Sequence, residues 1–595
     1  MKISFVVLCG FLLLGRIVRA HTIISTALGE VRGVVLRAEN GRNFTGFLGI
    51  RYAKPPLDSL RFAPPETPEP WTGIFNATVD SPKCIQANDF FENGSVIGSE
   101  DCLYLNIYVP KLPHEDDSYP YPVMIWIHGG SWLRWSGTMA DFPPGRLMRK
   151  DLILVSINYR LGWFGFLSTE DEVVPGNNGL KDQVAAIKWV KEHISSFGGD
   201  PDRITLAGQD TGAISAHLHS LSPKTKKLIF GVIAQSGTAL DPRTIHYPGE
   251  ALNKAKILAN SLSCSSDDNR SMVDCLRNAE AVKIAQSISL LRIWKHLPDI
   301  PLRAVVEHSH SDAFLLEHPE KTIRNGKQAR VPLLVGTVAN EGTLYALAWS
   351  SIIRELSNNY RTVFPVIFSY EEYHLNNTEK NVTDSIKNYY FDSNEIGSNS
   401  AGRLEKALNT RFYKNPLNLL IGLQRANNTI YLYRLNYRGS NSFANLFDTS
   451  LEHCDKVCHY DDLRYLFNLS RILGKVENHA SQGETLMIES ITELWYNFLA
   501  IRKPTPETTE LLPVKWEHIG PDQKDPIQVL MINGPQNFTM ESISQDELTK
   551  ESFWNDLALP QSTTYNISSA SRMSFKERLS HFFENIRNGF KKVFG

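Results

Sequence analysis

The sequence carries almost no net charge. Its 595 residues hold 62 Lys and Arg against 64 Asp and Glu, which gives a formal charge of −2. A protein that binds nucleic acid through its phosphates needs an excess of basic residues on at least one face. The balance therefore argues against charge-driven binding as the main function, and we expect no nucleic-acid partner.

Long apolar runs and low-complexity segments are also scarce. After the N-terminus there is no stretch of eighteen apolar residues, about the length that a membrane-spanning helix needs. Between Thr22 and about Pro560 no repeat, linker-like composition or block of like charge marks a domain boundary. We therefore expect one large domain over residues 21–560. We also expect no metal site and no cofactor.

The N-terminus has the pattern of a signal peptide. An apolar run from Ile3 to Leu14 follows a basic residue, and small residues mark a cleavage site after Ala20. Arg16 and Arg19 lie close to that site, which leaves an uncleaved N-terminal anchor as an alternative. The prediction is that residues 1–20 are removed and that the rest of the chain is secreted into the extracellular space.

Cysteine is rare, and its count agrees with secretion. Of seven cysteines, Cys9 falls in the expected signal peptide, which leaves an even number for an oxidising compartment. Ten Asn-x-Ser/Thr sequons agree with a glycosylating route. The predicted glycosylation sites are Asn43, Asn76, Asn93, Asn269, Asn376, Asn381, Asn427, Asn468, Asn537 and Asn566.

Short apolar runs alternate with helical patterns along the chain. Residues 182–195 have apolar side chains at helical spacing. Runs of β-branched and apolar residues, typical of buried strands, cover 123–127, 152–157, 204–207 and 331–335. This alternation predicts an α/β fold, with a large, mainly parallel twisted central sheet flanked by helices.

Eight short motifs follow one another in a fixed order. They are 49–56 (GIRYAKPP), 100–106 (EDCLYLN), 128–131 (HGGS), 178–183 (NGLKDQ), 197–201 (FGGDP), 235–237 (QSG), 340–342 (NEG) and 459–463 (HYDDL). In this order they resemble the type-B carboxylesterase/cholinesterase family over about nine-tenths of the chain. The resemblance implies the α/β-hydrolase fold.

The family resemblance also bears on the cysteines. It implies one disulfide between Cys84 and Cys102 and a second, local one between Cys264 and Cys275. Cys454 and Cys458 match neither pair, and they are either bonded to each other or free.

Residues 208–212 (GQDTG) have the frame of a nucleophile elbow. They follow a strand-like run and precede a helix-like stretch, and the two glycines allow strand and helix to approach closely. The serine that the family carries at the centre of this frame is replaced by Asp210. Gln209 likewise replaces the family's usual Glu.

Chain order identifies the remaining positions of the site. The order nucleophile, acid, histidine gives Asp210, Glu341 and His459 as the triad positions. The resemblance further implies that the oxyanion-hole amides lie at Gly130, Ser131 and Thr211.

An aspartate at the elbow changes the expected chemistry. Asp210 has no proton to give, and two carboxylates beside His459 favour a protonated imidazole that cannot act as a base. One oxygen of the longer side chain could also occupy the oxyanion hole. We therefore expect a non-catalytic extracellular binding or adhesion protein with an unknown protein partner. The serine-lacking members of the family, such as neuroligins, neurotactin and glutactin, imply the same.

Two enzymatic alternatives stay open. One is residual hydrolysis of carboxylic esters. The other is hydrolysis with an Asp nucleophile, as in haloalkane dehalogenases and epoxide hydrolases, where a carboxylate attacks saturated carbon and His activates water on the ester that forms.

The C-terminal segment, residues 561–595, combines a polar connector with a periodic stretch. From Met573 onward, apolar residues recur every three or four positions among basic ones, which predicts an amphipathic helix with a basic face. Such a helix could mediate self-association or contact an anionic membrane surface, and docking on its own domain is the alternative.

Overall fold

A computed structural model describes residues 21–88, 95–113, 120–295, 297–349, 352–372, 379–392, 396–397, 400–446, 456–473, 481–544, 553–557 and 559. Several predictions fall outside these ranges and remain predictions. They concern the signal peptide, the C-terminal helix, Cys454 and the sequons at Asn93, Asn376 and Asn566.

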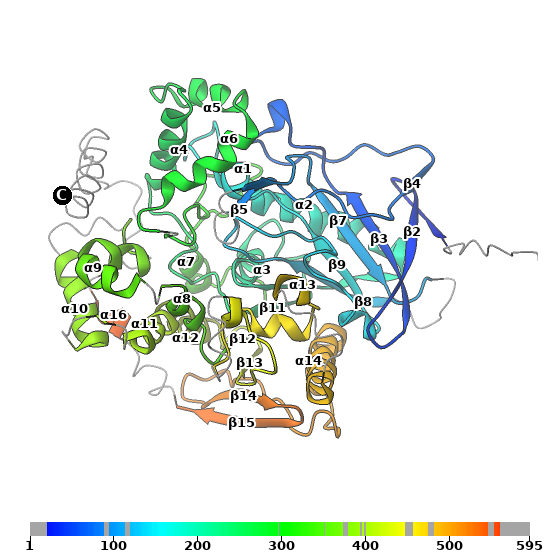
Figure 1. Ribbon diagram of the computed structural model, residues 1–595. Helices are drawn as coiled ribbons and strands as arrows, with labels where there is room; N and C mark the ends of the chain where they lie inside the picture. Colours follow the sequence, from blue (N-terminus) through cyan, green and yellow to red (C-terminus); the bar gives the residue numbers. More distant parts are fainter. Residues whose placement is uncertain are drawn as a thin grey trace, which may run out of the picture.

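One large sheet forms the centre of the molecule (Figure 1). Its strand order is β1-β2-β3-β7-β9-β8-β10-β11-β12-β13-β14-β15, with β4 paired to β2. The bounds are β1 His21–Thr26, β2 Gly29–Arg37, β3 Asn43–Arg51, β4 Ile74–Asn76, β7 Tyr104–Val109, β8 Tyr121–Ile127, β9 Ile153–Ile157, β10 Gly199–Gln209, β11 Gly231–Gln235, β12 Leu333–Val338, β13 Ile430–Leu435, β14 Ile527–Gly534 and β15 Asn537–Ile543. A separate pair joins β5 (Gln86–Asn88) to β6 (Ser95–Ile97).

The sheet is mixed, and its parallel part is central. Strands β9, β8, β10, β11, β12, β13 and β14 run parallel to one another. The prediction of a mainly parallel sheet describes this centre and not the two edges. Antiparallel pairs close both edges, through β1, β2, β3 and β7 on one side and β15 on the other.

Helices cover both faces of the sheet. Their bounds are α1 Gly162–Phe166, α2 Asn178–His193, α3 Thr211–Leu221, α4 Glu250–Ser261, α5 Asn269–Arg277, α6 Ala281–Gln286, α7 Pro319–Arg324, α8 Thr343–Ala348, α9 Ile353–Ile367, α10 Glu379–Phe391, α11 Ala401–Asn409, α12 Asn415–Gln424, α13 Ser470–Leu473, α14 Gln482–Ile501 and α16 Phe553–Asp556. The prediction of a helix over 182–195 corresponds to α2, which begins four residues earlier.

The alternating side chains of β8 divide the core in two. Val123 and Ile125 pack in one cluster with residues of α2 and α3. Met124 and Trp126 pack on the opposite face with residues of α14. Successive strand residues point to opposite faces, so a strand that is apolar throughout needs cover on both sides. This is the layered α/β architecture that the sequence predicts.

Both disulfides implied by the resemblance are present. Cys84 is bonded to Cys102, and Cys264 is bonded to Cys275. Cys458 is a buried free thiol whose Sγ lies 3.2 Å from Oγ of Ser442.

The described sequon asparagines lie at the surface, where a glycan could be attached. Asn269 and Asn468 are partly exposed, and the exposed ones are Asn43, Asn76, Asn381, Asn427 and Asn537. Their glycosylation stays a prediction. Within the described part of the chain, every helix is too short or too polar to cross a membrane.

Candidate active site

The candidate site lies at the carboxyl ends of three strands in the parallel part of the sheet. Strands β8, β10 and β12 have their carboxyl ends at the same edge, where ligands bind in open α/β sheets. Gly130 and Ser131 follow β8, Asp210 follows β10, and Glu341 follows β12. His459 joins them from the loop before the 3-10 helix Asp461–Tyr465. The structure thus brings together residues that are up to 329 positions apart in the chain.

Asp210 lies on the turn between β10 and α3 that the elbow motif predicts. Its backbone has φ 55° and ψ −126°, a conformation that non-glycine residues rarely adopt. Close packing explains the flanking glycines: a Cβ on Gly212 would lie 2.1 Å from the carbonyl oxygen of Ile127, and one on Gly208 would lie 2.4 Å from the backbone of Gly212. The strained turn therefore holds Asp210 at the tip where the strands end.

Glu341 and His459 form a close pair. Oε2 of Glu341 lies 2.6 Å from Nδ1 of His459, and its Oε1 accepts a hydrogen bond from the amide of Val338 at 2.9 Å. Nε2 of His459 faces Asp210, 3.8 Å from its Oδ1. The three side chains are at most 2% exposed, so bulk water does not screen their charges.

The two oxygens of Asp210 have different surroundings. Oδ2 accepts hydrogen bonds from the amides of Gly130 at 3.0 Å and Ser131 at 3.1 Å, and the hydroxyl of Thr211 lies 3.4 Å away. The carboxylate thus places one oxygen in the oxyanion hole, as expected. Oδ1 is buried and has no hydrogen-bond partner among the described residues. It is therefore the oxygen with free lone pairs, and it lies on the side of His459.

The charges of the site stabilise one another. Burial lowers the pKa of His459, but the charge of Glu341 and the contacts with Asp210 outweigh it and raise the pKa to about 9. Burial raises the pKa of Asp210, but the close contact with His459 and its charge outweigh it, with smaller effects of Arg243 and the Thr211 amide. The net pKa of Asp210 is well below its usual range. At neutral pH Asp210 is therefore a carboxylate and His459 an imidazolium.

Gln209 contacts the same ring nitrogen of His459 that faces Asp210. Its Nε2 lies 3.1 Å from Nε2 of His459, and its Oε1 has no partner among the described residues. A half-turn of the amide would direct Oε1 at the protonated Nε2. A neutral Gln209 beside a charged Asp210 gives the same formal charge as the family's Glu beside a neutral Ser. The two departures from the family pattern therefore compensate each other in charge.

Three side chains of the site, those of Tyr460, Asp299 and Arg134, were missed by sequence reasoning. The hydroxyl of Tyr460 donates to Oδ2 of Asp210 at 3.3 Å. Oγ of Ser131 donates to Oδ2 of Asp299 at 2.8 Å, and Arg134 pairs with the same carboxylate at 3.1 Å. The only sequence signal for Tyr460 was its place directly after His459 in one of the motifs.

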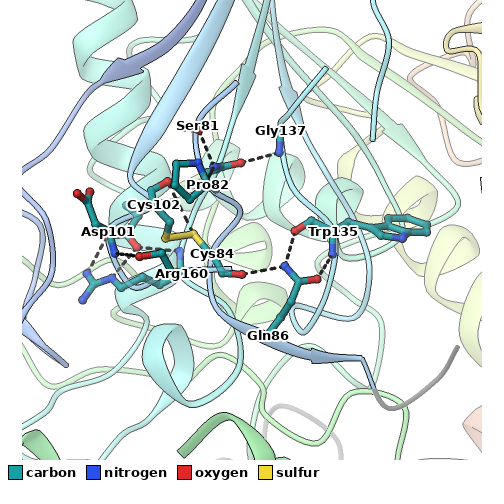
Figure 2. Close-up of a disulfide and its surroundings, with 12 residues drawn as sticks. Ser81, Pro82, Cys84, Gln86, Asp101, Cys102, Trp135, Gly137 and Arg160 are labelled. Atoms are coloured by element: carbon teal, nitrogen blue, oxygen red, sulfur yellow. Dashed lines mark hydrogen bonds and ion pairs between the residues drawn. A yellow bond between two sulfur atoms is a disulfide. The ribbon is translucent and has the colours of Figure 1, made fainter. Parts of the chain in front are cut away.

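The disulfide between Cys84 and Cys102 is linked to the oxyanion-hole loop by one side chain (Figure 2). The amide nitrogen of Gln86 donates to the carbonyl oxygens of Cys84 at 2.9 Å and Trp135 at 3.0 Å. Its amide oxygen accepts from the backbone N–H of Trp135 at 2.8 Å. Because Trp135 lies only four residues after Ser131, the disulfide helps to fix the loop that carries the two amide donors.

Removing this disulfide with the double substitution Cys84→Ser and Cys102→Ser is expected to cost about 3 kcal/mol of unfolding free energy, because it closes a short loop. It should also lower kcat/KM for the reaction catalysed at this site about tenfold, since the amide donors of Gly130 and Ser131 lose their support. Denaturant unfolding and steady-state kinetics measure the two effects. The matched control is Cys264→Ser with Cys275→Ser, which should lose stability and keep kcat/KM. An equal kinetic loss in both double variants would contradict the assigned support.

The raised pKa of His459 predicts a pH dependence of stability. The folded-state pKa lies above the 6.5 of an unfolded histidine, so its contribution is complete below pH 6.5 and is lost as the pH rises through about 9. Between pH 6 and pH 9.5 we expect the unfolding free energy to fall by about 3 kcal/mol, measured with denaturant. The control is Asp210→Asn, where one charge partner is gone and the fall should be smaller. Equal falls in both proteins would contradict the assignment.

With this geometry in place, comparison with known proteins decides the family. The sequence profile of the Carboxylesterase family matches residues 20–553. The chain belongs to the carboxylesterase family. The juvenile hormone esterase of Tribolium castaneum is 34% identical over 533 residues, covering 86% of this chain and 88% of that protein. Esterase FE4 of Myzus persicae is 33% identical, covering 86% of this chain and 89% of that protein.

A solved structure agrees on the fold. The crystal structure of juvenile hormone esterase from Manduca sexta, with OTFP covalently attached, matches with a TM-score of 0.77 and 26% identity. The match covers 90% of this carboxylesterase-family chain and all of that one. It confirms the α/β-hydrolase fold predicted from the sequence.

These relatives correct the prediction of function. They are esterases, so the expectation of a non-catalytic binding or adhesion protein, and of a protein that is not an enzyme, is wrong. The expected likeness to the serine-lacking adhesion proteins finds no support in them either. The sequence argument treated the carboxylate of Asp210 only as an obstacle. In the structure just one of its oxygens fills the oxyanion hole, and the other accepts no hydrogen bond from the described residues.

Proposed function

We propose that the protein is a hydrolase in which Oδ1 of Asp210 attacks a saturated carbon of an epoxide, and that it then hydrolyses the carboxylic ester formed at Asp210. One observation carries this proposal. Oδ2 is fixed by the amides of Gly130 and Ser131, while Oδ1 is unbonded among the described residues and lies 3.8 Å from Nε2 of His459. A carboxylate held in this way has one oxygen oriented and the other free to react.

In the first step, Oδ1 forms a bond to a ring carbon and the ring C–O bond breaks. The ring oxygen leaves as an alkoxide and needs a proton. The raised pKa of His459, about 9, means that Nε2 carries that proton at neutral pH. The products are an ester at Asp210, a neighbouring hydroxyl group and a neutral imidazole.

The second step uses the imidazole as a base. Alkylation removes the charge of Asp210, so one of the two groups that keep His459 protonated is lost and its pKa falls. His459 takes a proton from water, which attacks Cγ of Asp210, and negative charge develops on Oδ2 between the amides of Gly130 and Ser131. The Cγ–Oδ1 bond then breaks, and His459 returns its proton to the departing alcohol. Asp210 keeps one oxygen from water, and the proton of its new carboxyl group passes to His459.

The protonation state of the site favours epoxides over haloalkanes. An epoxide oxygen needs a proton as its C–O bond breaks, and His459 can supply it. A halide leaves without a proton, so His459 would first have to lose its proton to solvent before it could activate water. With an epoxide, His459 passes its proton to the leaving oxygen and is ready to act as a base in the second step.

Direct hydrolysis of carboxylic esters is the second candidate. It is favoured by the activities named for the relatives and by the close contact of His459 with Glu341. Two features weaken it: the oxyanion hole is filled by Oδ2 of Asp210, and a tetrahedral adduct with Asp210 would expel the weakly basic carboxylate rather than an alkoxide.

The test is to mix the protein with styrene oxide and, separately, with p-nitrophenyl acetate, and to quench within one turnover. Peptide mass spectrometry then locates any covalent adduct. We expect an alkyl ester on the peptide that contains Asp210, and release of the diol. The peptide with Asp462, a buried carboxyl group that binds Gln235, is the internal control and should stay unmodified. Cleavage of p-nitrophenyl acetate alone, with no adduct at Asp210, would establish the second candidate instead.

We also propose that the protein is exported. The two disulfides agree with an oxidising compartment, and seven described sequon asparagines are exposed or partly exposed.

A further inference from the structure

Tyr460 has a backbone conformation that a tyrosine rarely adopts. Its φ is 77° and its ψ is −9°, in the left-handed region that favours glycine. A bulky side chain there is strained, and such strain persists only where the surroundings enforce it. The side chain is 5% exposed. The backbone is therefore strained at Tyr460, the residue directly after His459.

The surroundings of the ring show what this conformation achieves. The ring of Tyr460 lies 4.2 Å from that of His459 and 4.9 Å, edge-on, from that of Trp135, measured between centroids. Its hydroxyl donates to Oδ2 of Asp210 at 3.3 Å. The left-handed backbone therefore directs the phenol back past its neighbour His459 to the reacting carboxylate.

The hydroxyl of Tyr460 keeps its proton and can therefore donate a hydrogen bond. Burial raises the pKa of Tyr460 well above its ordinary value, and the charge of Asp210 raises it further. The phenol therefore stays protonated at neutral pH. It joins the amides of Gly130 and Ser131 on the same oxygen, so Oδ2 has a side-chain donor in addition to the backbone ones.

We propose that Tyr460 is a catalytic hydrogen-bond donor of the oxyanion hole, which stabilises the negative charge on Oδ2 when water attacks the ester at Asp210. The inference rests on the proposed function, because it concerns the second step of that reaction. In the first step, charge moves from the carboxylate to the ring oxygen, and a donor on Oδ2 gives no assistance. In the second step, charge accumulates on Oδ2 itself. The hydroxyl should therefore act on the two steps differently.

The substitution Tyr460→Phe tests this difference. It keeps the ring and removes only the hydroxyl. With styrene oxide and rapid quenching, formation of the Asp210 ester should proceed at the wild-type rate or faster, because the carboxylate loses a donor. Hydrolysis of that ester should slow by about 100-fold, the usual effect of losing one oxyanion-hole donor. The ester should then accumulate at Asp210, where peptide mass spectrometry detects it.

The matched control is Tyr413→Phe. The ring of Tyr413 lies 5.2 Å from that of His459, but its hydroxyl is buried with no partner among the described residues. Its loss should leave both rates within about twofold of wild type. A merely structural role of Tyr460 would slow both steps together.

The outcomes separate this inference from the proposed function. Accumulated ester with unimpaired ester formation supports it. Equal slowing of both steps, or ester hydrolysis unchanged in Tyr460→Phe, overturns it while the proposed function stands. Absence of any ester at Asp210 in the wild-type protein overturns the proposed function and this inference with it.

Discussion

Replacing Asp210 with asparagine is expected to lower kcat/KM for epoxide hydrolysis by about 10⁴-fold or more, as expected for loss of a nucleophile. The asparagine carbonyl can accept the hydrogen bonds of Gly130 and Ser131, so the fold around the elbow should remain. Its amide nitrogen would occupy the place of Oδ1, and that nitrogen has no lone pair available for attack. Steady-state diol formation measures the loss.

The matched control is Asp462→Asn. Asp462 is a second buried carboxyl group near the site, and burial raises its pKa to about 6. Its Oδ2 accepts from Gln235 and Tyr433. Asp462→Asn should keep kcat/KM within about tenfold, and thermal unfolding should show both variants folded. Activity of Asp210→Asn within tenfold of wild type would remove Asp210 from the reaction.

Replacing Asp210 with serine is expected to create a serine esterase. The shorter side chain would leave the oxyanion hole, and His459 would lose one of its two carboxylate neighbours, so its pKa should fall and free it as a base. Glu341 already lies 2.6 Å from Nδ1, where the triad acid belongs. We expect kcat/KM for p-nitrophenyl acetate to rise by about 100-fold over wild type, within the range that general-base catalysis supplies.

Labelling by an organophosphate, followed by mass spectrometry, gives a second measure of the same change. The D210S variant should be labelled at position 210, and wild-type protein should not. The control D210S/H459A should lose both the labelling and the gain in ester turnover. A gain that survives without His459 would show that the new activity does not use the triad.

Much of the fold was predictable because its signals are local. Each buried parallel strand is a short apolar run, as in residues 123–127, and each motif sits at the end of such a run. The edges of the sheet were not predicted, because an antiparallel edge strand such as β15 depends on its partner and on solvent. Its residues are largely exposed, and no apolar run marks it.

The positions of the site were predictable from chain order, but their state was not. Asp210, Glu341, His459, Gly130 and Ser131 lie together in the structure. That one carboxylate oxygen accepts no hydrogen bond from the described residues depends on distances of a few tenths of an ångström, which sequence does not encode in any readable pattern. Because Oδ1 accepts no hydrogen bond from the described residues, we interpret Asp210 as a nucleophile and not only as a group that blocks the oxyanion hole.

Tyr460 shows the same limit. Its side chain reaches Asp210 because its backbone is left-handed, and sequence gives that conformation a signal only when the residue is glycine or asparagine. The link from Cys84 through Gln86 to Trp135 was equally hidden, since the residues are distant in the chain and none is unusual in type.

The most direct test of the account is a single turnover of styrene oxide in water labelled with ¹⁸O, with protein in excess over substrate. The proposed reaction breaks the Cγ–Oδ1 bond, so the diol should leave with an unlabelled oxygen from Asp210. The label should appear in the peptide that contains Asp210. Label in the diol and none in that peptide would show that water attacks the substrate directly, and would contradict a covalent intermediate at Asp210.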